Sequence, residues 1–226
     1  MNMQKVFEHY QPEVNFQDIP ATTNASGTRY YETPSGRYPS VTTVVGWEKS
    51  QFFKEWRKKN PKESKRVLNR GNVLHETIED YLNNKDIDLM SLPPVVSSLF
   101  TQMKTELDRI DNIYALEVPL WSETLELAGR VDCVAEYNGE LSIIDFKGST
   151  REKYEADIQN YFLQGTAYAL MWQERTGTEI KKFNIIISNE DGMPCQVFTG
   201  NTIDYVKPLH DTIQKYHEHN KTLNMV

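Results

Sequence analysis

The 226-residue sequence has only two cysteines, Cys133 and Cys195. Two thiols cannot form the four-thiolate sites of structural zinc or of an iron–sulfur cluster, so the sequence excludes both kinds of site. We expect both cysteines to be buried apolar residues. The phosphate-binding pattern GxxxxGK(S/T) is also missing, and we therefore expect no nucleotide cofactor.

Long apolar runs are missing as well. No stretch approaches the roughly 20 apolar residues of a membrane span, so we expect no membrane partner. The N-terminal stretch MNMQKVFEHYQPEVNF lacks the apolar run of a secretory signal, and it lacks the arginines of a transit peptide because the first arginine is Arg29. These features predict a cytoplasmic protein, and the length of the chain predicts a single domain over residues 1–226.

The charge of the chain is acidic but unevenly distributed. The net charge of −7 argues by itself against a nucleic-acid partner. Between Lys54 and Arg70, however, eight basic residues stand against two acidic ones, which gives this segment +6 and leaves −13 elsewhere. The segment is either a phosphate-binding surface or a solvated helix face, and the sequence leaves both open. Four aromatic residues lie just before it or within it and would suit base stacking, although such residues more often face the core: Trp47, Phe52, Phe53 and Trp56.

Periodicity divides the chain into four parts. We expect an irregular arm or short hairpin at 1–40, a helical region at 41–110, a catalytic core at 111–200 and a C-terminal helix at 201–226. Within the helical region the pattern predicts helices at Ser50–Lys59, from Asn60 to about Asn83, and at Pro94–Ile110. Gly71 interrupts the second of these patterns, and we expect it to mark either a helix break or a site of close backbone approach.

The core begins with short runs rich in β-branched and aromatic residues. They predict strands at Tyr114–Trp121, Leu127–Tyr137 and Glu140–Lys147. Asn138 and Gly139 tolerate positive φ, so they predict a tight hairpin between the last two strands. A helix at 153–175, ended by Gly177, and a strand at Lys181–Ser188 should follow.

Two acids and a lysine lie in these strands, where apolar residues are the rule. Alternation along a strand places Asp145 and Lys147 on one face, and the hairpin can bring Asp132 close to them. Buried carboxylates repel each other and are costly to desolvate, and a divalent cation relieves both problems. Carboxylate oxygens suit Mg2+ or Mn2+, which also bind phosphate oxygens. A plain aspartate–lysine ion pair is the alternative explanation.

The stretches GRVD (129–132) and IIDFKGS (143–149) together resemble the PD-(D/E)XK nuclease superfamily. Within it they are most similar to the RecB-like branch, which includes mitochondrial and phage exonucleases. RGNVLHETIEDYL (70–82) resembles that branch's histidine-bearing helix, and QGTAY (164–168) resembles its QxxxY motif. YPSVTTVV (38–45) is similar to the serine–threonine segment of the mitochondrial-type members.

The resemblance implies a restriction-endonuclease-like core of the α/β (α+β) class, with a central mixed sheet flanked by helices and an N-terminal helical region. It implies a metal-dependent DNA exonuclease that acts on single-stranded ends with Mg2+ or Mn2+, in a bacterium or a phage-infected cell. Replication or recombination proteins would be its further partners. The alternatives are a recombination exonuclease of the lambda type that loads on duplex ends, and a non-catalytic DNA-binding module.

The same resemblance and the basic segment assign roles to individual residues. The predicted catalytic residues are Asp132, Asp145, Lys147, Gln164 and Tyr168. The predicted metal ligands are His75, Asp132, Asp145 and the backbone carbonyl of Phe146. The predicted DNA contacts are Ser40, Thr42, Arg57, Lys58, Lys62, Arg66 and Arg70.

Some of these residues also have an ordinary structural explanation. A lone histidine on an amphipathic helix, such as His75, is more often a surface or core residue than a ligand. Ser40 and Thr42 could bind phosphates or merely cap the next helix. Glu117 lies on the strand before the two acidic strands, where it could contact the metal or one of its ligands, but we expect it to be a surface glutamate.

Overall fold

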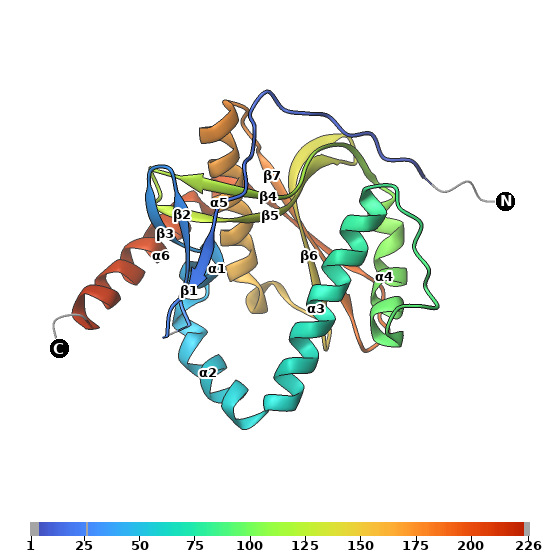
Figure 1. Ribbon diagram of the computed structural model, residues 1–226, viewed down its shortest axis with the longest axis horizontal. Coiled ribbons are helices and arrows are strands. Elements are labelled where there is room, and N and C mark those ends of the chain that lie inside the picture. Colours follow the sequence, from blue (N-terminus) through green and yellow to red (C-terminus); the bar gives the residue numbers. More distant parts are fainter. Residues whose placement is uncertain (1–4, 26, 224–226) are drawn as a thin grey trace.

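A mixed five-stranded sheet lies between two layers of helices in the computed structural model, which describes residues 5–25 and 27–223 (Figure 1). The strand order is β4-β5-β6-β7-β8, and only β6 and β7 are parallel. This is the mixed sheet flanked by helices that the sequence predicts. The strands are β4 Ile110–Ser122, β5 Leu127–Tyr137, β6 Glu140–Ser149, β7 Lys182–Asn189 and β8 Gln196–Asn201.

The tight turn between β5 and β6 forms as predicted. Asn138 and Gly139 have φ values of 51° and 79°, which the right-handed twist of a two-residue hairpin requires. From this turn the two strands pair residue by residue as far as Cys133 and Ile144. Beyond that pair β5 continues along β4, whereas β6 continues along β7. The two acidic strands therefore separate inside the sheet.

Six helices and two short 3-10 turns surround the sheet in the described part of the chain. The helices are α1 Val41–Val45, α2 Ser50–Lys59, α3 Pro61–Leu82, α4 Pro94–Leu107, α5 Gln159–Thr176 and α6 Thr202–Leu223, and the turns are η1 Trp47–Lys49 and η2 Glu155–Asp157. None of the helices in the described ranges is long and apolar enough to cross a membrane.

Gly71 does not interrupt α3, contrary to the sequence-based expectation. The helix runs through it without a break, and nothing lies within 4 Å of the position that a Cβ atom would take. A glycine inside a helix costs only about 1 kcal/mol relative to alanine. The burial of Leu74, Ile78 and Tyr81 on the same helix outweighs that cost.

The two helix layers cover opposite faces of the sheet. Helices α1, α5 and α6 pack on the face that carries Ile143 and Ile185, and α3 and α4 pack on the face that carries Ile144 and Phe146. The alternation of β6 is therefore as predicted, because successive residues of that strand enter different core clusters.

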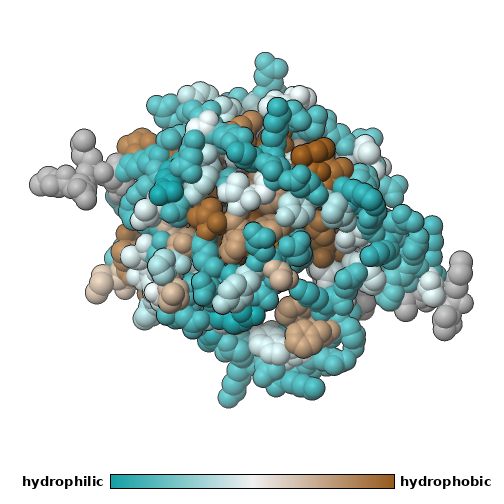
Figure 2. Space-filling view, turned by 180° about the vertical axis from the view of Figure 1, so that it is seen from behind, coloured by the Kyte–Doolittle hydropathy of each residue, from teal (hydrophilic) through white to brown (hydrophobic). Residues whose placement is uncertain are grey.

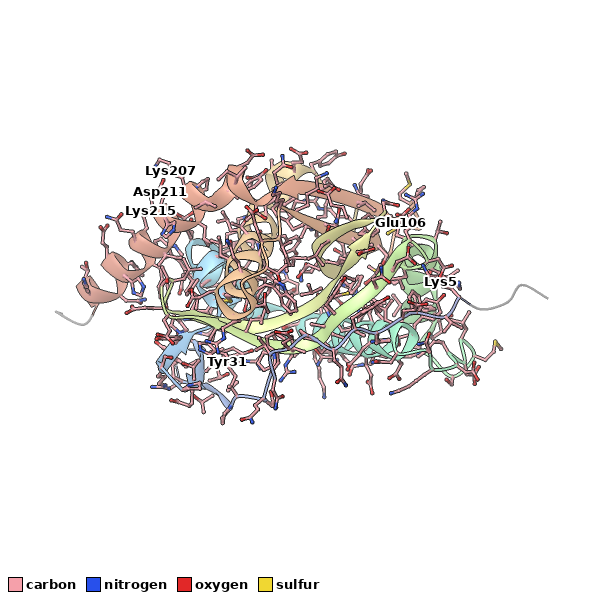
Figure 3. All side chains as sticks on the ribbon, turned by 90° about the horizontal axis from the view of Figure 1, so that it is seen from above. Lys5, Tyr31, Glu106, Lys207, Asp211 and Lys215 are labelled. Carbon is pink, nitrogen blue, oxygen red and sulfur yellow. The ribbon has the colours of Figure 1, made fainter. Side chains whose placement is uncertain are left out.

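Residues 21–39 form a small antiparallel sheet, so of the two alternatives expected for residues 1–40 the structure here contains the hairpin and not the irregular arm. Its strands are β1 Ala21–Thr23, β2 Arg29–Thr33 and β3 Gly36–Pro39. Tyr31 packs with Ile19, Trp121 and Ala128, which fixes this small sheet under one end of the main sheet (Figure 3). In the same view Lys5 and Glu106 lie at the opposite end of the molecule from α6.

Helix α2 and the first half of α3 form a V that projects from the body of the protein (Figure 1). None of the residues of α2 is buried. The expectation that aromatic residues here face the core is wrong for Phe52 and Phe53, which are 65% and 46% exposed. An amphipathic helix thus presents two of its three aromatic residues to solvent.

Candidate active site

Asp132 lies at the point where β5 and β6 separate. The amide N–H of Phe146 donates a 2.9 Å hydrogen bond to the Oδ2 atom of Asp132. The side chain of Asp132 thus accepts the hydrogen bond that a backbone carbonyl of β5 would accept if the two strands were still paired here. In a strand the N–H and C=O of one residue point to the same side, so the carbonyl of Phe146 also points toward this gap.

Asp145 is buried and is held by two donors on the α5 side of the sheet. The ammonium of Lys147 donates to its Oδ1 atom at 2.6 Å, and the amide of Gln164 donates to the same atom at 2.7 Å. The aspartate–lysine ion pair is therefore present. The other oxygen, Oδ2, is buried and has no hydrogen-bond partner among the described residues. A buried carboxylate oxygen without a partner is costly, which makes this atom a candidate metal ligand.

Charge and burial compete at this pair. Burial raises the pKa of Asp145, and the ammonium of Lys147 only partly offsets it, so the net direction is upward. Burial lowers the pKa of Lys147, but Asp145 and Asp132 outweigh burial and raise it. Lys147 is therefore an ammonium at neutral pH, and its Nζ atom lies 5.3 Å from the centre of the Tyr161 ring.

A second group of ligand atoms comes from α3, β4 and β5. The Nδ1 atom of His75 lies 3.6 Å from Oε1 of Glu117 and 3.7 Å from Oδ2 of Asp132. One donor atom of each residue falls within 4.8 Å of the other two. Burial opposes the protonation of His75, but Asp132 and Glu117 outweigh burial and raise its pKa. The geometry thus brings a nitrogen and two carboxylates to one point.

Glu117 is not the surface glutamate that the sequence suggests. Its side chain is only 24% exposed and faces His75. The register explains this position, because Leu116 pairs with Cys133 and Val118 pairs with Val131, which leaves Glu117 opposite Asp132. Glu117 also has a φ of 48°, in the left-handed region that residues with a side chain rarely adopt. In the sequence, its place on the strand before the two acidic strands is the signal for this role.

The donor set fits a divalent cation. Carboxylate oxygens suit Mg2+, and an imidazole nitrogen beside them favours Mn2+. His75, Glu117 and Asp132 could ligate such an ion directly. Asp145 is not part of this three-residue cluster, although its charge affects the pKa of His75 and its Oδ2 atom has no partner among the described residues.

A cavity of about 560 Å³ opens beside these groups. It is lined mainly by charged and polar side chains: Arg29, Tyr31, Ser40, Thr42, Asn72, His75, Glu76, Glu79, Glu117, Gly129, Arg130, Asp132, Lys147, Gln164 and Tyr168. Five of the predicted catalytic and metal-binding residues therefore share one cavity, and Asp145 contacts two of its lining residues.

Two motif residues owe their positions to close packing. Tyr168 is buried, and its hydroxyl oxygen would lie 2.6 Å from a Cβ atom placed on Gly129. The glycine of GRVD therefore makes room for the tyrosine of the QxxxY motif. Gln164, four residues before Tyr168, lies on the same helix face and reaches Asp145 rather than Lys147.

Ser40 caps α1, as its structural explanation predicts. Its hydroxyl accepts a hydrogen bond from the amide of Thr43 at 3.1 Å, and its side chain is almost fully buried. Thr42 is exposed and lines the cavity. Of these two residues, Thr42 is the better placed to meet a substrate.

The basic residues of α2 and α3 fall into two groups. Arg57, Lys58 and Lys62 are exposed. Arg66 is exposed but bonds to Glu63 and Glu190.

The prediction that Arg70 contacts DNA is wrong. Arg70 is only 4% exposed, and its guanidinium binds Glu190 and the carbonyl of Gly148. A charge run in the sequence does not show which of its members is buried, so Arg70 has to be removed from the DNA-binding set.

Residues 91–218 match the family model described as the PD-(D/E)XK nuclease superfamily. The chain belongs to this superfamily. In this PD-(D/E)XK protein, the residues predicted to carry the motif, Asp132, Asp145 and Lys147, lie at the separation of β5 and β6. The metal-binding candidates His75 and Glu117 add to that motif from outside the two strands.

Similar proteins include two named as mitochondrial genome maintenance exonuclease 1. The human protein is 29% identical over 180 residues, which cover 69% of this chain and 50% of that protein. The protein of Mus musculus is 27% identical over 174 residues, covering 69% of this chain and 51% of that protein. The PD-(D/E)XK chain thus spans about half the length of the relatives that it matches.

A crystal structure of a candidate exonuclease from Eubacterium rectale is also similar. It shares 13% identity and a TM-score of 0.46, covering 68% of this chain and 65% of that one. A likeness of this strength carries no argument about the site.

Proposed function

We propose that this protein is a metal-dependent deoxyribonuclease that removes nucleotides from single-stranded DNA ends. The observation that carries the proposal is the convergence of His75, Glu117 and Asp132 on one point beside a buried aspartate with an unpartnered oxygen. A DNA-binding module gains nothing from carboxylates that repel phosphate. Family membership supports the same reaction class.

The residues of the cavity have different proposed roles in phosphodiester hydrolysis. His75, Glu117 and Asp132, with Asp145 and the carbonyl of Phe146, are the proposed ligands of Mg2+ or Mn2+. Such a cation, when bound, neutralises charge on the phosphodiester and lowers the pKa of water.

Lys147 is positioned for a complementary role. Its ammonium is held at 2.6 Å by Asp145, lines the cavity, and remains charged because its pKa is raised. From there it can orient the attacking water or stabilise the negative charge that develops on the phosphate. Gln164 acts as a positioning residue, because it holds the oxygen of Asp145 that also binds Lys147.

A DNA partner is supported by the distribution of charge. Exposed basic residues lie on α2 and on the first half of α3, whereas the remainder of the protein is acidic. Two similar proteins are named as exonucleases, and we extend that activity to this chain as a proposal. We propose that Thr42 contacts a phosphate beside the cavity. Further from the cavity, the proposed phosphate contacts are Arg57, Lys58 and Lys62.

The direct test is a nuclease assay with end-labelled DNA. Single-stranded DNA, blunt duplex and closed single-stranded circles are incubated with Mg2+, with Mn2+ and with EDTA. We expect degradation of the linear single strand only, and only with metal. Faster degradation of the blunt duplex would favour the duplex-end-loading alternative, and cleavage of circles would contradict an exonuclease.

Two variants connect the activity to the site. Asp145→Asn and Lys147→Ala should each lower cleavage by about a thousandfold or more, since each removes a charge that the transition state needs. Asp86→Asn, which changes an exposed aspartate, is the matched control and should cleave at the wild-type rate. Normal cleavage by both site variants would contradict the proposal.

A further inference from the structure

Helix α2 carries an aromatic face that nothing in the described protein covers. Phe52 and Phe53 are 65% and 46% exposed, and their rings contact each other edge to face with centroids 5.4 Å apart. Trp56 lies one turn after Phe52 and is half-buried. Seen from behind, a hydrophobic patch lies over this helix at the bottom of the molecule, among hydrophilic residues (Figure 2).

Positive charge borders the aromatic face at helical spacing. Arg57 follows Phe53 by four residues and Lys59 follows Phe52 by seven, so each basic residue lies on the same side of α2 as a phenylalanine. Over the whole helix four basic residues stand against one acidic residue, which gives a net charge of +3. A polyanion with flat apolar groups would match both the exposed aromatic rings and the positive charge of α2.

The position of α2 connects this face to the cavity. Asn60 joins α2 directly to α3, and α3 carries His75 into the cavity. At 1.5 Å per residue, the part of α3 from Lys62 to His75 spans about 20 Å. A strand that reaches the metal-binding candidates is therefore only a few nucleotides away from α2.

We infer that Phe52 and Phe53 form a stacking platform for unpaired bases, while Arg57 and Lys59 hold the phosphates on either side. This inference rests on the proposed function. It names the surface that makes the proposed nuclease selective for single strands. Aromatic side chains stack on any base whose face is free, and duplex bases are already stacked on one another. The platform therefore binds single-stranded DNA more tightly than duplex DNA, which meets only the basic residues.

Equilibrium binding tests the platform apart from cleavage. In EDTA, fluorescence anisotropy measures the affinity of the protein for a labelled single-stranded oligonucleotide of 15 thymidines and for a blunt duplex. The double variant Phe52→Ala/Phe53→Ala should bind the single strand about tenfold more weakly. Ile203→Ala, which removes a 77% exposed side chain from α6, is the control and should bind like the wild type.

The salt dependence separates stacking from phosphate contacts. Loss of a phosphate contact lowers the slope of log affinity against log salt by about 0.7 for single strands. Arg57→Ala should therefore lower this slope, whereas the phenylalanine variant should weaken binding equally at every salt concentration. Circular dichroism of each variant confirms that α2 is still folded.

A scan with abasic sites locates the stacked bases. Removing one base at a time from the oligonucleotide should weaken wild-type binding at one or two positions, and this loss should vanish in the phenylalanine variant. Equal single-strand affinity of the wild type and the variant would overturn the inference while leaving the nuclease proposal intact. A wild type that degrades DNA and forms a dimer broken by the variant would also overturn it, since a second copy would then cover the face. A wild type without any single-strand binding or cleavage would overturn both proposals.

Discussion

The amide of Phe146 and the carboxylate of Asp132 form a 2.9 Å hydrogen bond across the point where β5 and β6 part. This bond connects the first acid of the motif to the strand that carries the second acid and the lysine. It fixes Asp132 where its Oδ2 atom also faces His75. The separation of two strands thus creates the space for the site, and one side chain holds the site together.

Glu117 combines a strained backbone with a place in the candidate metal site, and a substitution can separate the two effects. Its φ of 48° is costly for a residue with a side chain, and its carboxylate lies beside His75 and Asp132. Glu117→Gly should remove that strain and stabilise the protein by about 1 kcal/mol without metal, yet weaken Mn2+ binding by about tenfold or more. Thermal unfolding in EDTA and calorimetric titration with Mn2+ measure the two effects.

Glu126 provides the matched control for that variant. It also has a positive φ, of 51°, but it is exposed and lines a different cavity. Glu126→Gly should stabilise the protein to a similar degree and leave Mn2+ affinity unchanged. Unchanged Mn2+ affinity in the Glu117 variant would show that Glu117 is not a ligand.

Arg70 should be a stability residue rather than a DNA contact. Glu190→Gln leaves the buried guanidinium of Arg70 without its charged partner and should lower the free energy of unfolding by about 2 kcal/mol. Denaturant unfolding measures this loss. Urea unfolding curves that coincide for the wild type and Glu190→Gln would contradict a stabilising role of the pair.

The pH dependence of that loss follows from the pKa of Glu190. Burial raises this pKa, but Arg66 and Arg70 outweigh burial and lower it below its usual value of 4.5. A carboxylate with a lowered pKa stabilises the fold above its unfolded pKa, and the stabilisation is lost as pH falls through its folded pKa. The difference between wild type and Glu190→Gln should therefore be constant above about pH 5.5 and shrink below pH 4.5. A difference that grows with acidification would refute the assignment.

Gly129 should tolerate no side chain. A Cβ atom at this position would lie 2.6 Å from the hydroxyl oxygen of Tyr168, so Gly129→Ala should destabilise the protein by about 1–3 kcal/mol and reduce cleavage. Gly71→Ala is the control, because nothing lies within 4 Å of its Cβ position and alanine favours a helix. Equal stability of both variants in thermal unfolding would contradict the predicted clash.

Local rules predict much of the fold and of the motif. The Asn138–Gly139 turn, the start of α3 directly after Asn60, and the shared face of Asp145 and Lys147 each depend on neighbouring residues in the chain, and each is confirmed. For Glu117 such rules favour a surface glutamate, since its place in the site depends on the register between β4 and β5 and on a left-handed backbone.

Burial explains the remaining differences. Arg70 and Arg57 belong to the same basic run, but the packing of α3 against the sheet buries Arg70 and leaves Arg57 in solvent. The amphipathic pattern of α2 predicts a helix, but it cannot show that the aromatic face of the helix remains uncovered. Both features depend on where a helix lies in space, which local periodicity does not encode.

Anomalous scattering at the manganese absorption edge shows whether a metal ion binds at Asp132, with crystals of the protein soaked in MnCl2. We expect an anomalous peak within bonding distance of Asp132, His75 and Glu117, and its loss in the Asp132→Asn variant. Soaked crystals without a peak at these residues, from protein that degrades single-stranded DNA with Mn2+, would contradict the proposed metal site.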